Sequence, residues 1–349
     1  MLDYFTTYDI VIEGFFLDDS ELTFTNEKPY VIYGYAAVPP AKTLEIQAGA
    51  RVHFHDNSGI IVADTGSIQA NGQLSQDQEL LEGEIIFEGD RLEPSFADVP
   101  GQWGAIWMTD GSTNNRFNHV TIKNATVGML MDSNDGTTEP TLRISNTQIY
   151  NSSNVGLLAR TGFVEAENLV VNNSGQVSVN LSLGGKYSFK HCTIANYWQN
   201  SFRNFPALLI ENQLQTQDVT FVSDLEQADF FNCIVYGNER VEVGFNQSEE
   251  AAFNFKFENS LVRIDPFNTS ILNLPEYDFD DPTKYEGILL NDDPLFLDQQ
   301  FNQLIISNES PAVNLGNLPT AAEVPFDILG VSRASAPDAG AYQAIDFEE

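Results

Sequence analysis

The chain of 349 residues is poor in positive charge and in cysteine, and it has no long apolar run. Lys and Arg together number 16 against 50 Asp and Glu, which gives a formal net charge of −34. Nucleic acid is therefore excluded as a partner, because binding it depends on Lys and Arg displacing counterions from phosphates. The two cysteines, Cys192 and Cys233, are too few for a disulfide framework or a zinc site of the usual spacing.

Membrane-spanning and helical patterns are missing as well. No apolar stretch approaches the roughly 18 residues of a transmembrane helix, so no transmembrane segment is expected. The chain opens with Met1-Leu2-Asp3-Tyr4, which lacks the basic start and apolar core of an export signal. Long runs with a period of 3.6 residues are also missing. The sequence therefore predicts a protein built mainly from strands.

A short pattern recurs along the chain. It consists of a polar residue, usually His or Asn, two residues, a branched aliphatic residue, one residue and Asn, as in His119-Val-Thr-Ile122-Lys-Asn124. Most copies start 21 to 27 residues apart, which suits one coil of a strand solenoid, whereas one gap of 41 residues holds either an extra coil or a loop insertion. The later copies start at Asn146, Glu167, His191, Asn232 and Asn259.

Alternation within each copy predicts which side chains face the interior, because successive side chains of a strand point to opposite sides. The predicted aliphatic stack is Ile122, Ile149, Val170, Ile194, Val235 and Val262. The residues two positions earlier share its parity: Val120, Thr147, Asn168, Cys192, Cys233 and Ser260. The two cysteines are expected as stacked buried thiols, because parallel Cβ vectors do not favour a disulfide. The closing Asn tolerates left-handed turns and can stack into an amide ladder.

The predicted fold is all-β, a single-stranded right-handed parallel β-helix. Short apolar pairs separated by Gly turns extend the solenoid to the N-terminal side of the repeat. Both ends read as caps, which a solenoid needs to cover its open apolar ends. The expected divisions are a cap over 1–30, a parallel β-helix over 31–264 and a C-terminal segment over 265–349 that packs on the last coils. Within the helix we expect Gly-punctuated coils over 31–116, Asn-ladder coils over 117–264 and an insertion over about 197–227.

Two stretches resemble secreted and lipid-anchored right-handed β-helix proteins of Bacteroidetes, in the pectate-lyase-like superfamily. Residues 30–107 carry Gly66-Ser-Ile-Gln-Ala-Asn-Gly72 and Pro100-Gly-Gln-Trp-Gly104, and residues 291–343 end in Pro337-Asp-Ala-Gly-Ala-Tyr342. The family usually has Gly-Asp-Trp-Gly-Gly at the second motif, from which this chain departs at two places. The resemblance implies a secreted protein or an outer-membrane surface lipoprotein whose export signal has been removed. It carries over no catalytic residue.

The start of the predicted insertion is the candidate binding site. Tyr197-Trp198 and Phe202-Arg203-Asn204-Phe205 place aromatic rings beside Arg and Asn. Such a set suits stacking on sugar rings or docking of a protein partner, and packing within the insertion is the alternative.

An acidic loop is the candidate metal site. Asp132, Asn134 and Asp135 precede Gly136 and resemble a calcium loop. The pattern departs from an EF-hand, because the glycine comes one place early and Arg143 stands at the twelfth position. A plain loop and a calcium site of another design are both open. His53 and His55 face one side of a strand, but two histidines alone make an incomplete metal site.

An enzyme on this fold needs catalytic side chains that converge on one substrate bond. A lyase acting on acidic polysaccharides needs clustered cations, and the candidates are scattered: Arg143, Arg160, Lys186, Lys190 and Arg203. A hydrolase needs paired carboxylates, for which Glu165, Glu167 and Glu211 are candidates.

We therefore expect a non-enzymatic cell-surface or secreted protein, monomeric in isolation, that binds a glycan or an outer-membrane protein partner. One alternative is a polysaccharide lyase or glycoside hydrolase on the same fold. The other is an adhesin module stabilised by calcium.

Overall fold

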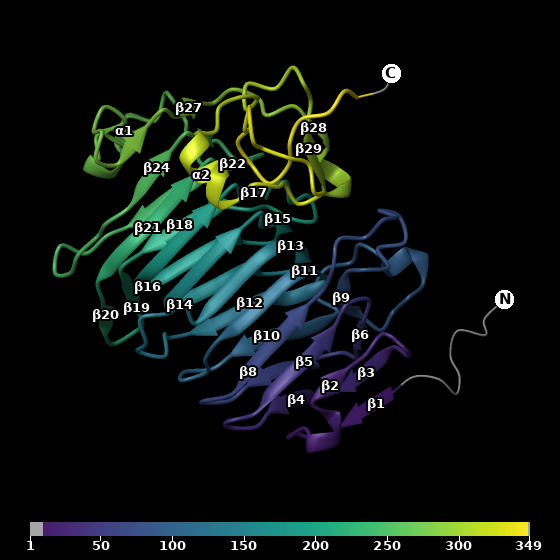
Figure 1. Ribbon diagram of the computed structural model, residues 1–349. Helices are drawn as coiled ribbons and strands as arrows, with labels where there is room; N and C mark the ends of the chain where they lie inside the picture. The colour runs from purple at the N-terminus through teal and green to yellow at the C-terminus, as the bar shows by residue number, and fades with distance from the viewer. Residues whose placement is uncertain (1–9, 348–349) are drawn as a thin grey trace.

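The computed structural model describes residues 10–347, and its architecture is an all-β solenoid (Figure 1). Twenty-five strands form one hydrogen-bonded system in which every strand pairs in parallel with its neighbours. Successive strands along the chain fall into three stacks, which we call columns A, B and C. The expected all-β parallel architecture is confirmed.

Column A is the longest stack. Its eleven members are β1 (Ile10–Glu13), β3 (Tyr30–Tyr33), β6 (Arg51–Phe54), β9 (Ile85–Gly89), the second halves of β11 (Asn115–Lys123) and β13 (Leu142–Ser152), β15 (Val170–Ser174), β17 (Thr193–Asn196), β22 (Ile234–Gly237), β25 (Leu261–Val262) and β27 (Leu289–Leu290).

Columns B and C complete each coil. Column B contains β4 (Tyr35–Val38), β7 (Gly59–Val62), β10 (Trp103–Met108), β12 (Ala125–Asp132), the first halves of β14 (Val155–Glu167) and β16 (Val177–Lys190), β18 (Leu208–Glu211) and β23 (Val243–Asn246). Column C contains β2 (Thr23–Phe24), β5 (Thr43–Gln47), β8 (Ser67–Asn71), the first halves of β11 and β13, the second halves of β14 and β16, β21 (Leu225–Phe231), β24 (Lys256–Glu258) and β26 (Tyr285–Glu286).

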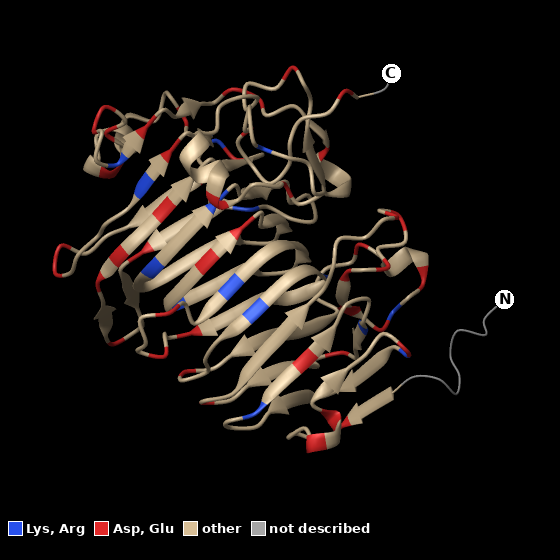
Figure 2. Ribbon diagram, viewed as in Figure 1, with Lys and Arg blue, Asp and Glu red and all other residues tan. Residues whose placement is uncertain are grey.

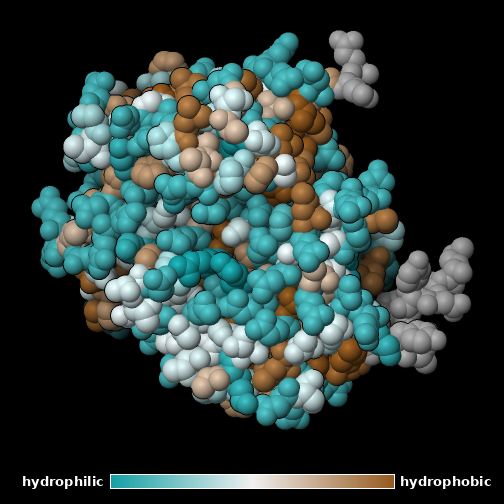
Figure 3. Space-filling view, viewed as in Figure 1, coloured by the Kyte–Doolittle hydropathy of each residue, from teal (hydrophilic) through white to brown (hydrophobic). Residues whose placement is uncertain are grey.

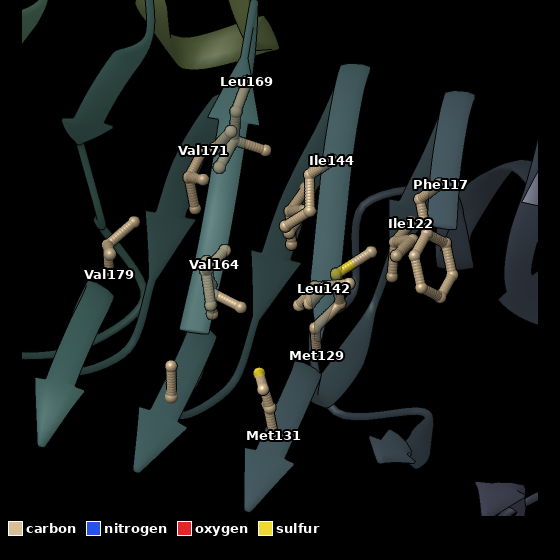
Figure 4. Packing of buried hydrophobic residues seen from close by; sticks show 14 of the residues in the cluster. Phe117, Ile122, Met129, Met131, Leu142, Ile144, Val164, Leu169, Val171 and Val179 are labelled. Carbon is tan, nitrogen blue, oxygen red and sulfur yellow. The ribbon is translucent and has the colours of Figure 1, made fainter. Parts of the chain in front are cut away.

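The interior is a stack of buried aliphatic and aromatic side chains (Figure 4). The phenyl rings of Phe189 and Phe230 stack with centroids 5.0 Å apart, and Phe257 follows at 4.7 Å. Cys192 and Cys233 are buried free thiols, and the amide of Cys192 lies 3.4 Å from the Cys233 sulfur. The predicted stacking of the thiols is therefore confirmed.

The predicted register is wrong in the third copy of the repeat. Val171, not Val170, pairs with Ile149 on one side and Ile194 on the other. The copy begins at Asn168, which has a left-handed φ of 51° at the turn and does not point into the interior. Leu169 and Val171 are the interior residues, as Figure 4 shows. The remaining members of the aliphatic stack pair as predicted.

Asparagine ladders line two corners of the coil. At the turn that closes the repeat, Asn151 donates to Asn124 over 3.2 Å, and Asn173 donates to Asn151. A second ladder runs along the turn that opens the repeat, where Asn146 donates to Asn118 over 2.9 Å and Asn168 to Asn146 over 2.8 Å. The opening turn needs its polar residue because the backbone there is left-handed, which Asn tolerates.

The gap of 41 residues is a loop insertion and not an extra coil, because β17 pairs directly with β22. The inserted chain makes two excursions: a loop over 197–207 and an antiparallel hairpin of β19 (Gln213–Gln215) and β20 (Thr220–Val222).

The coil is longer than predicted at both ends, since it begins before residue 31 and continues past residue 264. Strands β1 and β2, within the expected cap, already stack on later coils, whereas residues 1–9 of that cap lie outside the described residues. Strands β26 and β27 continue the coil past residue 264 to Leu290.

The remaining C-terminal chain, 291–347, packs along the outer surface of column A (Figure 1). It contains an antiparallel pair, β28 (Phe296–Asp298) and β29 (Gln303–Ile306), and the helix α2 (Leu318–Glu323). Its apolar side chains cover the outward-facing residues Val170, Ile234 and Leu261.

Helices are few and short. Besides α2 there is α1 (Thr269–Leu272), together with single 3₁₀ turns η1 (Asp19–Glu21), η2 (Pro94–Phe96), η3 (Pro275–Tyr277) and η4 (Gln299–Phe301). Across residues 10–347, none of the helices has the length and apolar character that crossing a membrane requires.

Candidate functional site

The predicted binding residues of the insertion divide into buried anchors and exposed rings. Trp198 is only 7% exposed, and its indole nitrogen donates to Ser201 over 2.9 Å. Tyr197 meets the Phe296 ring edge-on at 6.2 Å. Phe202, by contrast, is 98% exposed. Among Tyr197, Trp198 and Phe202, only Phe202 has a largely exposed side chain.

Arg203 is a structural clamp and is not available to a ligand. Its guanidinium makes two contacts of 2.7 and 2.9 Å with the Glu242 carboxylate, and both side chains are almost completely buried. Burial raises the pKa of Glu242, although Arg203 opposes that shift. Glu242 also accepts the backbone amide of Ala207 over 2.8 Å. The pair therefore holds the 203–207 segment against the coil.

The clamp places Phe205 at the rim of a groove of about 570 Å³ over the outer surface of column B. A neighbouring hollow of about 290 Å³ is lined by Phe267 and shares Arg240 and Asp265 with the groove. We call the joined depression the aromatic groove. Its main lining residues are Asn204, Phe205, Leu209, Arg240, Asp265, Phe267, Asn268 and Leu274.

The aromatic groove combines exposed rings with planar polar groups. Phe205 is 45% exposed and Phe267 is 85% exposed. Arg240, which lines both hollows, is largely exposed and lies 3.6 Å from the Asp265 carboxylate, so its guanidinium keeps free donors. Asn204 adds an amide to the wall. Rings that offer an apolar face next to such hydrogen-bonding groups are suited to the mixed surface of a sugar.

The predicted metal residues are engaged by neighbouring strands and by their own loop. Asp132 accepts the Trp107 indole N–H over 2.7 Å and pairs with Arg160 at 2.8 Å. The Asn134 side chain bonds the backbone at Gly136, and Asp135 accepts the Thr137 amide over 3.0 Å. In the part of the chain that the structure describes, no group of three or more His, Cys, Asp or Glu side chains is arranged to hold a metal ion.

His53 of β6 and His55, which follows this strand, each lie beside a carboxylate on the outside of column A. His55 contacts Asp90 at 2.7 Å, and His53 lies 3.6 Å from Glu88. Both acids come from β9 or the residue that follows it, the next strand in the stack.

The outer surface of column C carries most of the residues considered for enzymatic chemistry, and both acids and bases lie along the stack (Figure 2). Arg116 and Arg143 are neighbours on adjacent strands. Arg143 pairs with Glu165 at 3.3 Å, and Lys190 pairs with Glu323 of the C-terminal segment. Most of this face is hydrophilic, whereas hydrophobic side chains gather near the two ends of the view (Figure 3).

The structure brings only part of the predicted catalytic set together. Glu165 and Glu167 lie on one strand of column C, but Glu211 lies in column B, where it accepts from Asn246 over 2.8 Å. Lys186 lies over the Phe163 ring at 4.4 Å. The candidate cations are therefore dispersed or paired and do not form a cluster.

Comparison of the sequence with models of protein families finds no match, and comparison with curated proteins finds none either.

The sequence reasoning missed Arg240, Asp265 and Phe267. A signal exists in Asp265-Pro266-Phe267-Asn268, where an aromatic residue stands among turn-forming residues and outside any predicted strand. Their proximity to Phe205 was not predictable, because it arises from stacking of coils that are some 60 residues apart.

Proposed function

We propose that this protein is a non-enzymatic glycan-binding module of the cell surface or the secreted fraction, and that the aromatic groove binds the sugar chain. The observation that carries the proposal is the pair of exposed rings, Phe205 and Phe267, which line two hollows that share Arg240 and Asp265. Exposed apolar side chains that gather in a groove mark an interaction site, and sugar rings offer apolar faces that can cover phenyl rings.

The finer description of the fold and its location belongs to the same proposal. We infer a right-handed coil, because crossovers between parallel strands of one sheet are right-handed in nearly all proteins. The resemblance to Bacteroidetes β-helix proteins supports export to the outer-membrane surface or beyond. We expect a monomer in isolation.

The test is calorimetric titration with a panel of neutral oligosaccharides. Each ring should contribute about 1 kcal/mol, so the double variant Phe205→Ala/Phe267→Ala should bind roughly 10- to 50-fold more weakly than the wild type. Phe301→Ala is the matched control, since this ring is 69% exposed but lies in the C-terminal segment. Equal affinity of the double variant and the control would contradict the proposal.

A carbohydrate-active enzyme is the second candidate, favoured by two acids on column C. Burial raises the pKa of Glu167 and also that of Asp229, and both face outward near Lys190. Carboxyls with raised pKa values are suited to proton transfer. Release of reducing or unsaturated ends from the same oligosaccharides, lost in Glu167→Gln, would favour this candidate over the binding module.

A further inference from the structure

A separate pocket lies where the C-terminal segment passes the corner between columns C and A. Its volume is about 320 Å³. From the coil it is lined by His119 and Glu167, and from the segment by Glu323 and Phe326. Leu74 closes the opposite side. Among the described residues, 10–347, no Lys or Arg lines this pocket. We call it the corner pocket.

Glu167 is the acid of the corner pocket whose carboxylate makes no hydrogen bond or ion pair among the described residues. Neighbouring Glu165 pairs with Arg143, and Glu323 of the pocket pairs with Lys190. Asp327, the third acid of the pocket, accepts backbone amides, among them that of Gln343 over 2.8 Å. Burial raises the pKa of Glu167 most, Glu165 and Glu323 raise it further, and Lys190 lowers it. A positive charge placed in the pocket would stabilise this carboxylate.

Two other groups suit the same positive charge. The His119 side chain is half-buried and has no hydrogen-bond partner within the described chain, and burial lowers its pKa, so the neutral ring can accept an N–H. Phe326 is 55% exposed at the mouth, and the face of an aromatic ring attracts cations. An acid, an acceptor and a ring therefore surround one small volume.

We propose that the corner pocket binds a primary ammonium group carried by an amino sugar. An ammonium group has three N–H donors, which match the Glu167 carboxylate, the His119 imidazole and the backbone or side-chain oxygens around them. The net charge of −34 favours a cation over an anion at this position. The choice of a sugar as carrier rests on the proposed glycan-binding function, whereas the choice of an ammonium group rests on the pocket and on the net charge.

The experiment titrates the full chain with the fully deacetylated glucosamine trimer, with its N-acetylated counterpart and with lysine amide, at neutral pH and low salt. The deacetylated trimer should bind at least 10-fold more tightly than either of the others. Glu167→Gln keeps the shape of the side chain and should weaken binding of the deacetylated trimer at least 10-fold, with an unchanged melting temperature. Phe326→Ala should weaken it severalfold.

The matched control removes the same charge elsewhere on column C. Glu45 is exposed on β5, which β8, β11 and β13 separate from β14, so Glu45→Gln should leave the affinity unchanged. Equal losses in Glu45→Gln and Glu167→Gln would show attraction by overall charge and overturn the site. Equal binding of the acetylated trimer would overturn the ammonium group, and equal binding of lysine amide would overturn the sugar carrier.

Failure of this proposal is distinguishable from failure of the glycan-binding function. Neutral oligosaccharides that bind in a manner sensitive to Phe205→Ala/Phe267→Ala, but not to Glu167→Gln, would leave the aromatic groove as a binding site and remove the corner pocket. Binding of the deacetylated trimer that is sensitive to Glu167→Gln, without binding of neutral sugars, would leave the corner pocket as a binding site and remove the aromatic groove.

Discussion

At the residue scale, His191 stands where most other coils have asparagine. It has the same left-handed backbone, with a φ of 50°, and its Nε2 lies 2.9 Å from the Asn232 amide nitrogen. The imidazole is completely buried. Burial and the nearby Arg333 lower its pKa from 6.5 to about 2, so the ring is neutral in the folded protein.

This shift predicts a pH dependence of stability. The unfolded chain binds a proton on His191 near pH 6.5 and the folded chain does not, so stability is complete above that pH and falls as the pH decreases. Between about pH 7.5 and about pH 5 the loss should reach about 2 kcal/mol. His191→Asn should remove this pH-dependent loss of stability and should also extend the amide ladder. Urea unfolding at both pH values measures the change.

The control for that measurement is His55→Asn, since His55 is about half exposed beside Asp90. The loss of stability that His191 carries between the two pH values should persist in this variant. If His191→Asn also follows the wild type, the imidazole does not carry the effect.

At the scale of elements, the C-terminal segment depends on one buried arginine. Arg333 donates to the carbonyls of Phe326 over 2.6 Å and of Gly340 and Ala341 over 3.1 Å. It also donates to Asn168 of the opening ladder over 2.8 Å, and so joins the segment to the coil. Burial lowers the pKa of Arg333 to about 10.

Arg333→Met is expected to loosen the segment. Several buried carbonyls would lose their donor, which should cost about 3 kcal/mol. Amide hydrogen exchange should accelerate over 291–347 and change little in the coil, because local opening is reported segment by segment. Arg91→Met is the control, because that exposed pair with Glu93 should contribute less than about 1 kcal/mol. Uniform acceleration through the whole coil would argue against a separable segment.

At the scale of the whole molecule, the excess of acids opposes folding. With 50 acids and 16 Lys and Arg on a compact solenoid, like charges repel across the surface. Salt shortens the range of that repulsion, from about 30 Å at 0.01 M to about 10 Å at 0.1 M.

The melting temperature should therefore rise when NaCl is increased from about 0.01 to about 0.5 M. Calcium chloride at matched ionic strength separates screening from binding. A further rise with calcium, abolished in Asp132→Asn/Asp135→Asn, would support the adhesin alternative. A fall with NaCl would mean that ion pairs such as Arg160–Asp132 outweigh the repulsion.

How far the sequence could predict the structure is clearest in the third repeat. Both Val170 and Val171 are aliphatic, so alternation alone admits two registers, and a shift of one residue exchanges inside and outside. The choice depends on the left-handed turn at Asn168 and its ladder bond to Asn146. The sequence also carries a signal that the C-terminal segment covers column A. Adjacent apolar residues such as Ile234-Val235 indicate strands that are buried on both faces.

The sequence by itself determined the all-β solenoid, the aliphatic stack of most coils and the stacked thiols, because each follows from local alternation and from repeat spacing. Only the tertiary structure decided the candidate sites. The Arg203–Glu242 clamp joins residues 39 apart, and the corner pocket brings Glu167 to Phe326 across the docking of the C-terminal segment. Such contacts depend on how coils stack and how the segment packs on them, which no local pattern encodes.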